Sequence, residues 1–436
     1  MIINSQSDQP LYIDPQQLVN AISALSYQDN QLCIEGLKLT DLAKQHGTPV
    51  YIYSNEAILA KYRDYDNSFA EIDHQICYAV KANSNLAILA ELAKVGAGFD
   101  IVTGGELARV LKAGANPSKI VFSGLGKTAD DIKTALDVGI ACFNVESEAE
   151  LYRISDVAKH LGKTAPISLR VNPNVDAKTH PYISTGLKEN KFGITHEEAP
   201  RIYQLANTLP NINIVGIDCH IGSQLTEAQP FVDALDKVIE LIHQLKADGI
   251  ALKHIDLGGG LGVQYIHEQV ASIGEFAQLI LPKLKTLGLK LYLEPGRSIV
   301  ANAGVLLTKV DILKPTEHKN FAIVDAAMND LIRPSLYQSE MAVIPVNLSS
   351  DNDRKAWDIV GAICETGDFL AKNRELALSE GDLLAITGAG AYGFSMASNY
   401  NSRPRACEIL VKDGQAHVIR ERETYDSLWE REKIVP

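Results

Sequence analysis

The chain has 436 residues, of which 46% are hydrophobic and 22% charged, and its formal charge at pH 7 is −13. This composition is typical of a globular protein with two or three domains, or of one large barrel with an addition. The acidic balance speaks against nucleic acid or an anionic membrane as a partner. The N-terminal stretch MIINSQSDQPLYID lacks the apolar run of a secretory signal, and no stretch approaches the roughly 20 apolar residues of a membrane span.

Six cysteines lie far apart in the chain, without a CxxC pair. In a chain of this length with no signal peptide, we expect reduced thiols and not a disulfide framework or a zinc site. The sequence therefore predicts a cytoplasmic protein and no metal site.

Short apolar runs alternate with segments of helical periodicity between residues 76 and 294, which predicts eight parallel strands. Glycine follows several of the predicted helices, at the position where a helix commonly ends. Eight strand–helix units indicate a (β/α)8 TIM-type barrel and not a doubly wound sheet, which usually has fewer strands and an early GxGxxG turn. The predicted strands are 76–80, 98–102, 120–122, 141–145, 167–171, 214–219, 255–257 and 291–293.

The pattern changes after residue 297, where the apolar runs alternate or are short and turn signals separate them. The tetrapeptide KDGQ between two such runs predicts a β-hairpin. We expect a mainly antiparallel β domain, resembling a sandwich or barrel. The predicted domains are a barrel over 46–300 and a β domain formed by 1–45 and 301–436.

Lys81 stands at the end of the first barrel strand, in ICYAVKANSN. It can be a polar exit from the strand into solvent. Alternatively, an amine in a partly dry pocket has a lowered pKa and can form a Schiff base with an aldehyde. Active sites of such barrels lie at the C-terminal ends of the strands, so the residues after the other strands bear on this choice.

Glycines follow the seventh strand in GGGLG, which includes Gly259 and Gly260. Without a Cβ they let backbone N–H groups approach an anion, and barrels frequently bind phosphate after strands seven and eight. The alternative is a tight turn with no ligand. Ser223, in HIGSQ after the sixth strand, can add a hydroxyl donor. The loop after the fifth strand, residues 172–193, is placed to close over such a site.

Glu294 ends the eighth strand, where an unpaired buried carboxylate is costly. Its partner is either the nearby Arg297 or a protonated ring nitrogen on a cofactor. A lysine, a phosphate-binding loop and a carboxylate around one pocket are what pyridoxal 5′-phosphate (PLP) requires. His220 can lie against the cofactor ring, although a histidine at a strand end is often only a polar cap.

The chain resembles the diaminopimelate decarboxylases, PLP enzymes with an alanine-racemase-like barrel, over nearly its whole length. The motifs that carry the resemblance stand in the family's order and are highly specific together. They are YAVKANSN, GFDIVTGGEL, HIGSQ, DLGGGLG, EPGRSIVANAG, DAAMNDLIRPSLY, VGAICETGDFLA and GAGAYGFSMASNYNSRPR.

The resemblance implies a role for each matching residue. Lys81 is then the lysine that binds PLP, and Cys364 is the proton donor, supplied by the partner subunit of a homodimer with shared active sites. The other implied PLP contacts are His220, Ser223, Gly259, Gly260, Glu294, Pro295, Gly296, Arg297 and Tyr392. The implied substrate contacts are Arg297, Arg333, Tyr337, Glu365 and Tyr392.

The residue types suit that substrate, since diaminopimelate carries a carboxylate and an amine at its far end. Arg333 and Arg297 can bind the carboxylate with Tyr337 as an added donor, while Glu365 takes the ammonium. The alternatives are a surface arginine before a proline for Arg333 and a buried core thiol for Cys364.

The resemblance implies decarboxylation of meso-2,6-diaminopimelate at its D-configured centre to L-lysine and CO2, the last step of lysine biosynthesis. The nearest rival is a related decarboxylase of ornithine, arginine or carboxynorspermidine, whose substrates would not need Arg333. A racemase with the same type of barrel, a non-catalytic PLP carrier and a purely structural protein are further alternatives. A carrier would need only the barrel and gives no reason for the β domain with Cys364, Glu365 and Tyr392. A structural protein gives no reason for glycines and charges at the strand ends.

Overall fold

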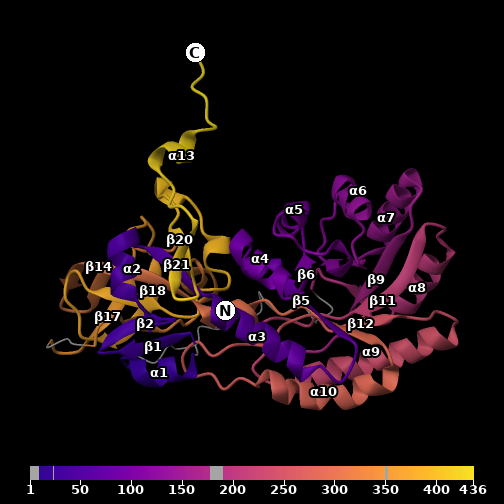
Figure 1. Cartoon of the computed structure of the whole chain (residues 1–436), viewed down its shortest axis with the longest axis horizontal. Helices are drawn as coiled ribbons and strands as arrows, with labels where there is room; N and C mark the ends of the chain where they lie inside the picture. The colour runs from indigo at the N-terminus through magenta and orange to yellow at the C-terminus, as the bar shows by residue number, and fades with distance from the viewer. Residues whose placement is uncertain (1–8, 23, 177–189, 349–351) are drawn as a thin grey trace. The chain divides into compact units, whose positions relative to one another are not determined.

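The computed structural model of the chain describes residues 9–22, 24–176, 190–348 and 352–436. The chain forms two compact units (Figure 1). The first, the barrel unit, comprises residues 59–263 and 269–299, and the second, the β unit, comprises 1–58, 264–268 and 300–436. Within the loop 172–193, residues 177–189 lie outside the described residues, so its closure over a site stays a prediction.

Eight parallel strands close on themselves in the barrel unit, because β13 pairs back with β5 and β8 pairs with β9. The predicted (β/α)8 barrel is therefore confirmed, and the ends of the predicted strands differ from the observed ones by at most two residues. In barrel order the strands are β5 (His74–Ala79), β6 (Gly98–Ile101), β7 (Ile120–Phe122), β8 (Cys142–Val145), β9 (Ala165–Asn172), β11 (Ile212–Asp218), β12 (His254–Asp256) and β13 (Lys290–Leu293). The short β10 (Ile194–Thr195) pairs with β9.

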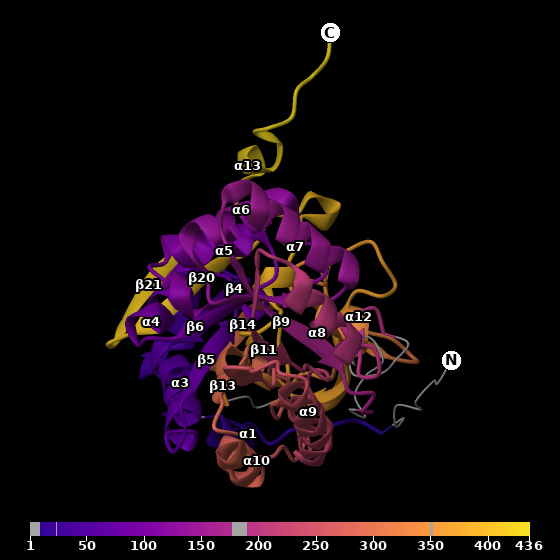
Figure 2. The same ribbon diagram turned by 90° about the vertical axis from the view of Figure 1, so that its right-hand side faces the viewer.

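Helices follow the strands and lie around them, as Figure 2 shows for α5 to α9. Local sequence sets their ends: Thr128 begins α6 with a capping box, and Gly139 ends it with φ of 76°, a conformation that glycine adopts without strain. The helices are α3 (Asn55–Ser68), α4 (Leu86–Lys94), α5 (Gly104–Lys112), α6 (Ala129–Val138), α7 (Glu148–Leu161), α8 (Ala199–Thr208), α9 (Gln229–Ala247), α10 (Ile273–Leu287) and α11 (Arg297–Val300).

Small and apolar side chains fill part of the barrel interior. Cys77, Val121, Cys142 and Val215 pack together there. All six cysteines are free, in agreement with the expected reduced thiols, and five of them are buried. The exception is Cys364, which is exposed.

The β unit is mainly antiparallel, as the sequence predicts. Its main sheet has the order β18-β17-β15-β14-β4-β20-β21, with β16 and β19 joined to it through β14. The KDGQ hairpin is confirmed, since β20 and β21 pair with Lys412 opposite Gln415. The main-sheet strands are β4 (Val50–Ser54), β14 (Gly304–Pro315), β15 (Asn320–Val324), β16 (Val343–Pro345), β17 (Lys355–Val360), β18 (Phe369–Leu376), β19 (Leu383–Ile386), β20 (Cys407–Lys412) and β21 (Gln415–Arg420).

A small separate sheet and four short helices complete the β unit. The small sheet has the order β1-β2-β3. Its strands are β1 (Leu25–Gln28), β2 (Gln31–Ile34) and β3 (Leu37–Lys38). The helices are α1 (Pro15–Ala21), α2 (Leu39–His46), α12 (Arg333–Tyr337) and α13 (Tyr425–Trp429).

The predicted domain boundary at residue 46 differs from the observed division. Strand β4, which the sequence placed in the barrel, pairs with β14 and with β20 of the β unit. All five of its residues are buried, because it lies inside that sheet. The β unit therefore extends to Ile58.

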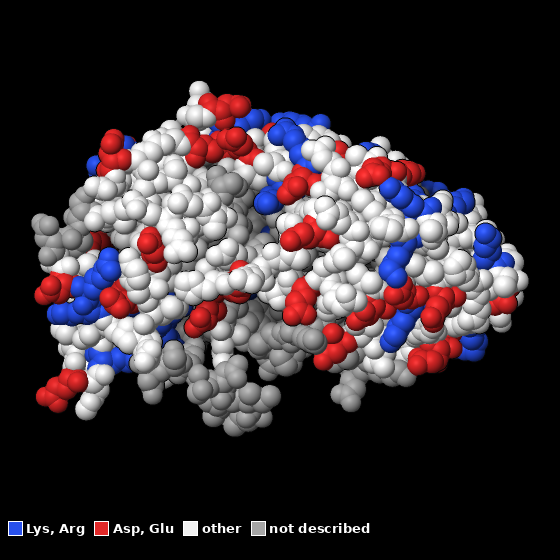
Figure 3. Space-filling view, turned by 90° about the horizontal axis from the view of Figure 1, so that it is seen from below, with Lys and Arg blue, Asp and Glu red and all other residues white. Residues whose placement is uncertain are grey.

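The face of the molecule in Figure 3 is neither predominantly acidic nor predominantly basic. Acidic and basic side chains are interspersed there over the described residues. Such a face offers no continuous basic patch of the kind that nucleic acid binding uses. Among the described residues, no helix is long and apolar enough to cross a bilayer.

Candidate active site

Lys81 lies in the 3-10 turn Val80–Ala82, directly after β5. Its Nζ donates to Oδ2 of Asp100, 3.1 Å away, near the end of β6. The Lys81 side chain is 38% exposed, whereas the Asp100 side chain is fully buried. The amine is therefore held against a buried carboxylate at the strand ends and still reaches solvent, which favours a pocket lysine over a simple exit from the strand.

The glycines after β12 are required by the close approach of neighbouring backbones. A Cβ on Gly259 would lie 2.2 Å from the Glu294 carbonyl oxygen, and one on Gly260 would lie 2.5 Å from the Gly222 carbonyl oxygen. The loops after β11, β12 and β13 thus pack together at one end of the barrel. This packing needs glycine with or without an anion, and it also leaves the backbone of the loop unshielded by side chains.

The loop after β13 reaches the turn that carries Lys81. A Cβ on Gly296 would meet the side chains of Ala79 and Ala82 at 3.0 Å, and the Ala79 N–H donates to the Pro295 carbonyl oxygen at 3.1 Å. The barrel therefore brings the predicted lysine and the EPGR segment together.

Arg297 and Ser223 also meet at this end of the barrel. The guanidinium of Arg297 is buried and donates to Ser223 Oγ through Nη2 at 3.0 Å and through Nε at 3.3 Å. Together they offer a charge and a hydroxyl beside the glycine loop, which is what a bound phosphate requires.

Glu294 is a buried carboxyl after β13, and its polar neighbours come from the end of β7 and from β8, which are not adjacent to β13 in the barrel. Its Oε1 lies 3.3 Å from Asn144 Nδ2 and 3.4 Å from Ser123 Oγ. Burial, with Asp100 and Asp256 nearby, raises the pKa of Glu294 well above its ordinary value. These hydrogen bonds reach neutral side chains inside the barrel, and the choice between Arg297 and a cofactor ring nitrogen as the charged partner of Glu294 stays a prediction.

Glu294 belongs to a buried cluster of carboxyls. One oxygen each of Asp218, Asp256 and Glu294 lie within 4.8 Å of one another. Burial raises the pKa of Asp256 to about 6, and burial with the neighbouring Asp256 raises that of Asp218 well above its ordinary value. Oδ1 of Asp100, Oδ1 of Asp218 and Oδ2 of Asp256 have no hydrogen-bond partner among the described residues.

This carboxyl cluster fits the cofactor that the sequence predicts. Arg170, whose Nε lies 3.9 Å from Asp218 Oδ2, supplies one positive charge, which cannot balance three buried carboxyls. The others must either keep protons or receive a positive group. The protonated ring nitrogen of PLP is such a group. The residues present therefore suit PLP at both ends, with carboxyls for the ring nitrogen and glycines, Ser223 and Arg297 for the phosphate.

His220 follows β11 and faces the glycine loop. Its Nδ1 accepts a hydrogen bond from the Gly259 N–H at 3.3 Å. Burial lowers the pKa of His220 well below its ordinary value, and the positive charges of Arg170 and Lys81 lower it further. The imidazole is therefore neutral, with its proton on Nε2.

Two predicted substrate residues lie on the short helix α12 of the β unit. Arg333 is buried, donates to the Tyr265 hydroxyl at 2.8 Å and places its guanidinium 4.8 Å from the centre of that ring. The alternative of a surface arginine is therefore wrong. Tyr337 ends the same helix and is half-buried.

Cys364 and Glu365 lie in an exposed turn of the β unit. The backbone N–H of Cys364 donates to Asn401 Oδ1 at 2.9 Å, and the Tyr400 hydroxyl donates to Glu365. Cys364 is exposed, so the alternative of a buried core thiol is wrong. Tyr392 has φ of 56°, a left-handed conformation that a non-glycine residue adopts at a cost and that is common at functional sites.

Sequence reasoning missed the buried carboxyls Asp100, Asp218 and Asp256, and it missed Tyr265 beside Arg333. The three aspartates stand inside or at the end of short apolar strands. A charged residue in such a strand is costly to bury, and this signal could have identified them.

The comparisons with known proteins agree with this geometry. Residues 55–301 match the family described as "Pyridoxal-dependent decarboxylase, pyridoxal binding domain". The chain therefore belongs to the pyridoxal-dependent decarboxylases.

Its relatives within that family are diaminopimelate decarboxylases. The chain is 57% identical to the diaminopimelate decarboxylase of Pseudomonas aeruginosa, over 95% of this chain and all of the relative. Two solved structures with bound L-lysine are also similar. The diaminopimelate decarboxylase of Helicobacter pylori has a TM-score of 0.87 at 45% identity, covering 90% of this chain and 98% of the other. The diaminopimelate decarboxylase of M. jannaschii is 40% identical to this chain, with a TM-score of 0.91. The match covers 95% of this chain and 99% of the other. The chain belongs to the diaminopimelate decarboxylases, which are PLP-dependent carboxy-lyases.

Proposed function

We propose that this chain removes CO2 from the D-configured centre of meso-2,6-diaminopimelate and releases L-lysine, as the last step of lysine biosynthesis in the cytoplasm. The observation that carries the proposal is the set of groups at one end of the barrel. There a lysine amine, a glycine loop with Ser223 and Arg297, and a buried carboxyl cluster are held by the loops of a single closed sheet.

When bound, PLP supplies an electron sink for the pair of electrons that a departing carboxylate leaves behind. Lys81 would supply the amine that holds the cofactor through its aldehyde, with loss of water, and Glu294 would keep the proton at the ring nitrogen. His220, a neutral imidazole, would contact the ring without adding charge. Ser223, Gly259, Gly260, Gly296 and Arg297 would hold the phosphate, with Pro295 and Tyr392 as further contacts.

The β unit supplies the groups that recognise the far end of the substrate. Arg333 pairs with the distal carboxylate, and Tyr337 and Tyr392 add hydroxyl donors. Glu365 takes the distal ammonium. The burial of Arg333 and its fixed contact with Tyr265 support this role, because a guanidinium already oriented loses little freedom on binding a carboxylate.

Cys364 gives a proton to the carbon that loses CO2. Its exposure in a turn held by Asn401 leaves the thiol free to approach a substrate bound elsewhere. We propose that Cys364 serves the barrel of a second copy, so that the enzyme is a homodimer with two shared active sites.

Replacing Cys364 by alanine is expected to slow product formation by about 10²- to 10⁴-fold, the range for loss of a positioned acid. PLP content should stay at the wild-type level, because Cys364 does not hold the cofactor. The control is Cys407→Ala, which removes a thiol from β20 of the same unit. Unchanged turnover in Cys364→Ala would exclude Cys364 as the proton donor.

Mixing two inactive variants tests the shared site. Random exchange between Lys81→Ala and Cys364→Ala dimers makes half of the dimers mixed, and each mixed dimer has one intact site. Activity should therefore recover to about a quarter of the wild-type value if the sites of a two-fold dimer are shared. Activity that stays at the level of the separate variants after exchange would show that each chain uses its own Cys364.

Arg333→Met is expected to lower kcat/KM for diaminopimelate by about 30- to 5,000-fold, because truncating a buried charge partner costs about 2–5 kcal/mol. PLP binding should be unaffected. Arg354→Met is the matched control, since Arg354 is exposed and also lies over a tyrosine ring, 4.3 Å from the centre of Tyr12. A kcat/KM within threefold of the wild type would remove Arg333 from the substrate site.

A further inference from the structure

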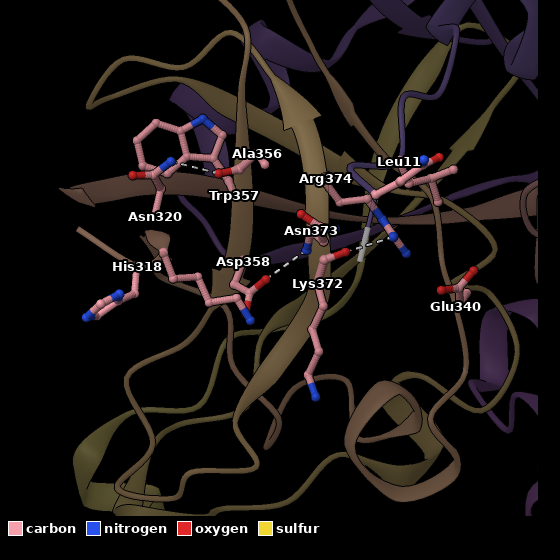
Figure 4. A pocket seen from close by; sticks show the side chains of 12 residues that line it. Leu11, His318, Asn320, Glu340, Ala356, Trp357, Asp358, Lys372, Asn373 and Arg374 are labelled. Carbon is pink, nitrogen blue, oxygen red and sulfur yellow. Dashed lines mark hydrogen bonds and ion pairs between the residues drawn. The ribbon is translucent and has the colours of Figure 1, made fainter. Parts of the chain in front are cut away.

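A cavity lies wholly within the β unit, and none of the residues discussed above for catalysis lines it. Its volume is about 450 Å³. The walls come from β15, β17 and β18, the turn before β15 and the N-terminal segment, as Figure 4 shows. The lining residues are Gln9, Leu11, His318, Lys319, Asn320, Glu340, Ala356, Trp357, Asp358, Lys372, Asn373 and Arg374.

Arg374 is the unusual member of this lining. It is only 4% exposed, and its Nε has no hydrogen-bond partner within the described parts of the chain. Nη1 donates to the carbonyl oxygen of Lys372 at 2.9 Å and Nη2 to that of Met341 at 3.5 Å. Burial lowers the pKa of Arg374 despite the more distant charges of Glu340 and Asp358. A buried cation without an adjacent anion is costly, and a bound anion would remove much of that cost.

Asp358, a buried acid of the lining, already has other partners. Asp358 Oδ2 pairs with Lys319 Nζ at 2.6 Å, and its Oδ1 accepts from the Asn373 N–H at 2.7 Å. Asp358 therefore cannot also neutralise Arg374. Lys372 adds a further positive charge to the lining; it is half-buried, with its Nζ 3.6 Å from the centre of the Phe369 ring.

We propose that this cavity is an accessory binding site for a small organic carboxylate, whose carboxylate group pairs with Arg374 at its Nε edge. The planar guanidinium matches a carboxylate in shape and charge. Asn320 and Asn373 offer polar groups around it, and Trp357 and Leu11 offer apolar wall. Glu340 is exposed on the same side as the Arg374 guanidinium in Figure 4, where it can receive an ammonium if the ligand is an amino acid.

Titration calorimetry on the full-length, PLP-loaded protein tests this site with succinate, L-lysine and inorganic phosphate as the three ligands. Succinate should bind, and Arg374→Gln should weaken its binding at least tenfold. Lys372→Gln should weaken it severalfold and serves as the second variant if Arg374→Gln does not fold.

Two control variants should bind succinate as the wild type does. Lys314→Gln removes an exposed lysine of β14 outside the cavity. Arg333→Met should also bind succinate normally, which separates this site from the proposed substrate site.

A thermal measurement gives a second, independent result. A ligand that binds only the folded state raises the Tm. Arg374→Met should melt at a higher temperature than the wild type without ligand, because the uncompensated charge is gone, and succinate should no longer raise its Tm.

The three ligands distinguish the source of the carboxylate. Tighter binding of L-lysine than of succinate, with the preference lost in Glu340→Gln, would identify an amino acid ligand. Equal or tighter binding of succinate would identify a simple organic acid. Three outcomes would overturn the proposal. Only phosphate binds, or succinate binds equally well to Arg374→Gln, Lys372→Gln and the wild type, or none of the three ligands binds.

Discussion

Lys81→Ala is expected to have no measurable turnover of diaminopimelate and to lose the covalent attachment of PLP. Without the amine after β5, the cofactor is held only by contacts to its phosphate and ring, and its aldehyde has no bonding partner. Reduction with borohydride followed by peptide mass mapping should find the cofactor's mass on the Lys81 peptide of the wild type. It should find none on the corresponding peptide of the variant.

The control for this experiment is Lys94→Ala, which removes an exposed lysine of α4 in the same barrel. It should keep turnover and the labelled peptide. Turnover in Lys81→Ala, or a label on a different lysine of the wild type, would show that Lys81 is not the cofactor lysine.

Glu294→Gln is expected to lower kcat by about 10²- to 10³-fold, the effect of removing one electrostatic contact from a closed site. Glutamine fills the same space and keeps hydrogen-bonding atoms for Ser123 and Asn144, so the fold should persist. It cannot supply the negative charge that holds a proton on the ring nitrogen. The loss should therefore appear in kcat more than in KM, with PLP still bound.

Glu240→Gln, on the exposed side of α9, is the matched control and should behave as the wild type does. A kcat within threefold of the wild-type value in Glu294→Gln would exclude Glu294 as the partner of the ring nitrogen. The aspartates of the cluster would then be the remaining candidates for that role.

The barrel could be predicted from sequence because most residues of its strands are apolar and buried, and helical segments separate the strands. The strand at β7 was predicted with both ends correct, since Ile120–Phe122 is bounded by a turn and by Ser123-Gly124. The same strand predictions indicated which polar residues are candidates for the site. The C-terminal ends of all strands of a parallel barrel lie at one end of the barrel, so residues that follow the strands lie close together.

Strand β4 shows where that reading fails. VYIYS is as apolar and buried as a barrel strand, so its own sequence does not tell which sheet it joins. Its place is decided by residues far along the chain, through pairing with β14 and β20. The local sequence pattern therefore predicts whether a segment is a helix or a strand better than it predicts which strand it pairs with.

The carboxyl cluster shows a second limit. Asp218 and Asp256 were read as parts of strands, and only the closed barrel brings them within reach of Glu294. The contact of Arg333 with Tyr265 likewise joins two segments 68 residues apart. The surroundings of the predicted site residues therefore could not be derived from the sequence, because they depend on the closed fold.

The measurement that tests the proposed function most directly is CO2 release from the purified, PLP-loaded protein. The protein is given meso-diaminopimelate, ornithine or arginine in parallel, and lysine is measured with the CO2. We expect release from diaminopimelate with one L-lysine for each CO2, and none from ornithine or arginine. Release from ornithine or arginine but not from diaminopimelate would contradict the substrate, and release from none of the three would contradict a decarboxylase of this group.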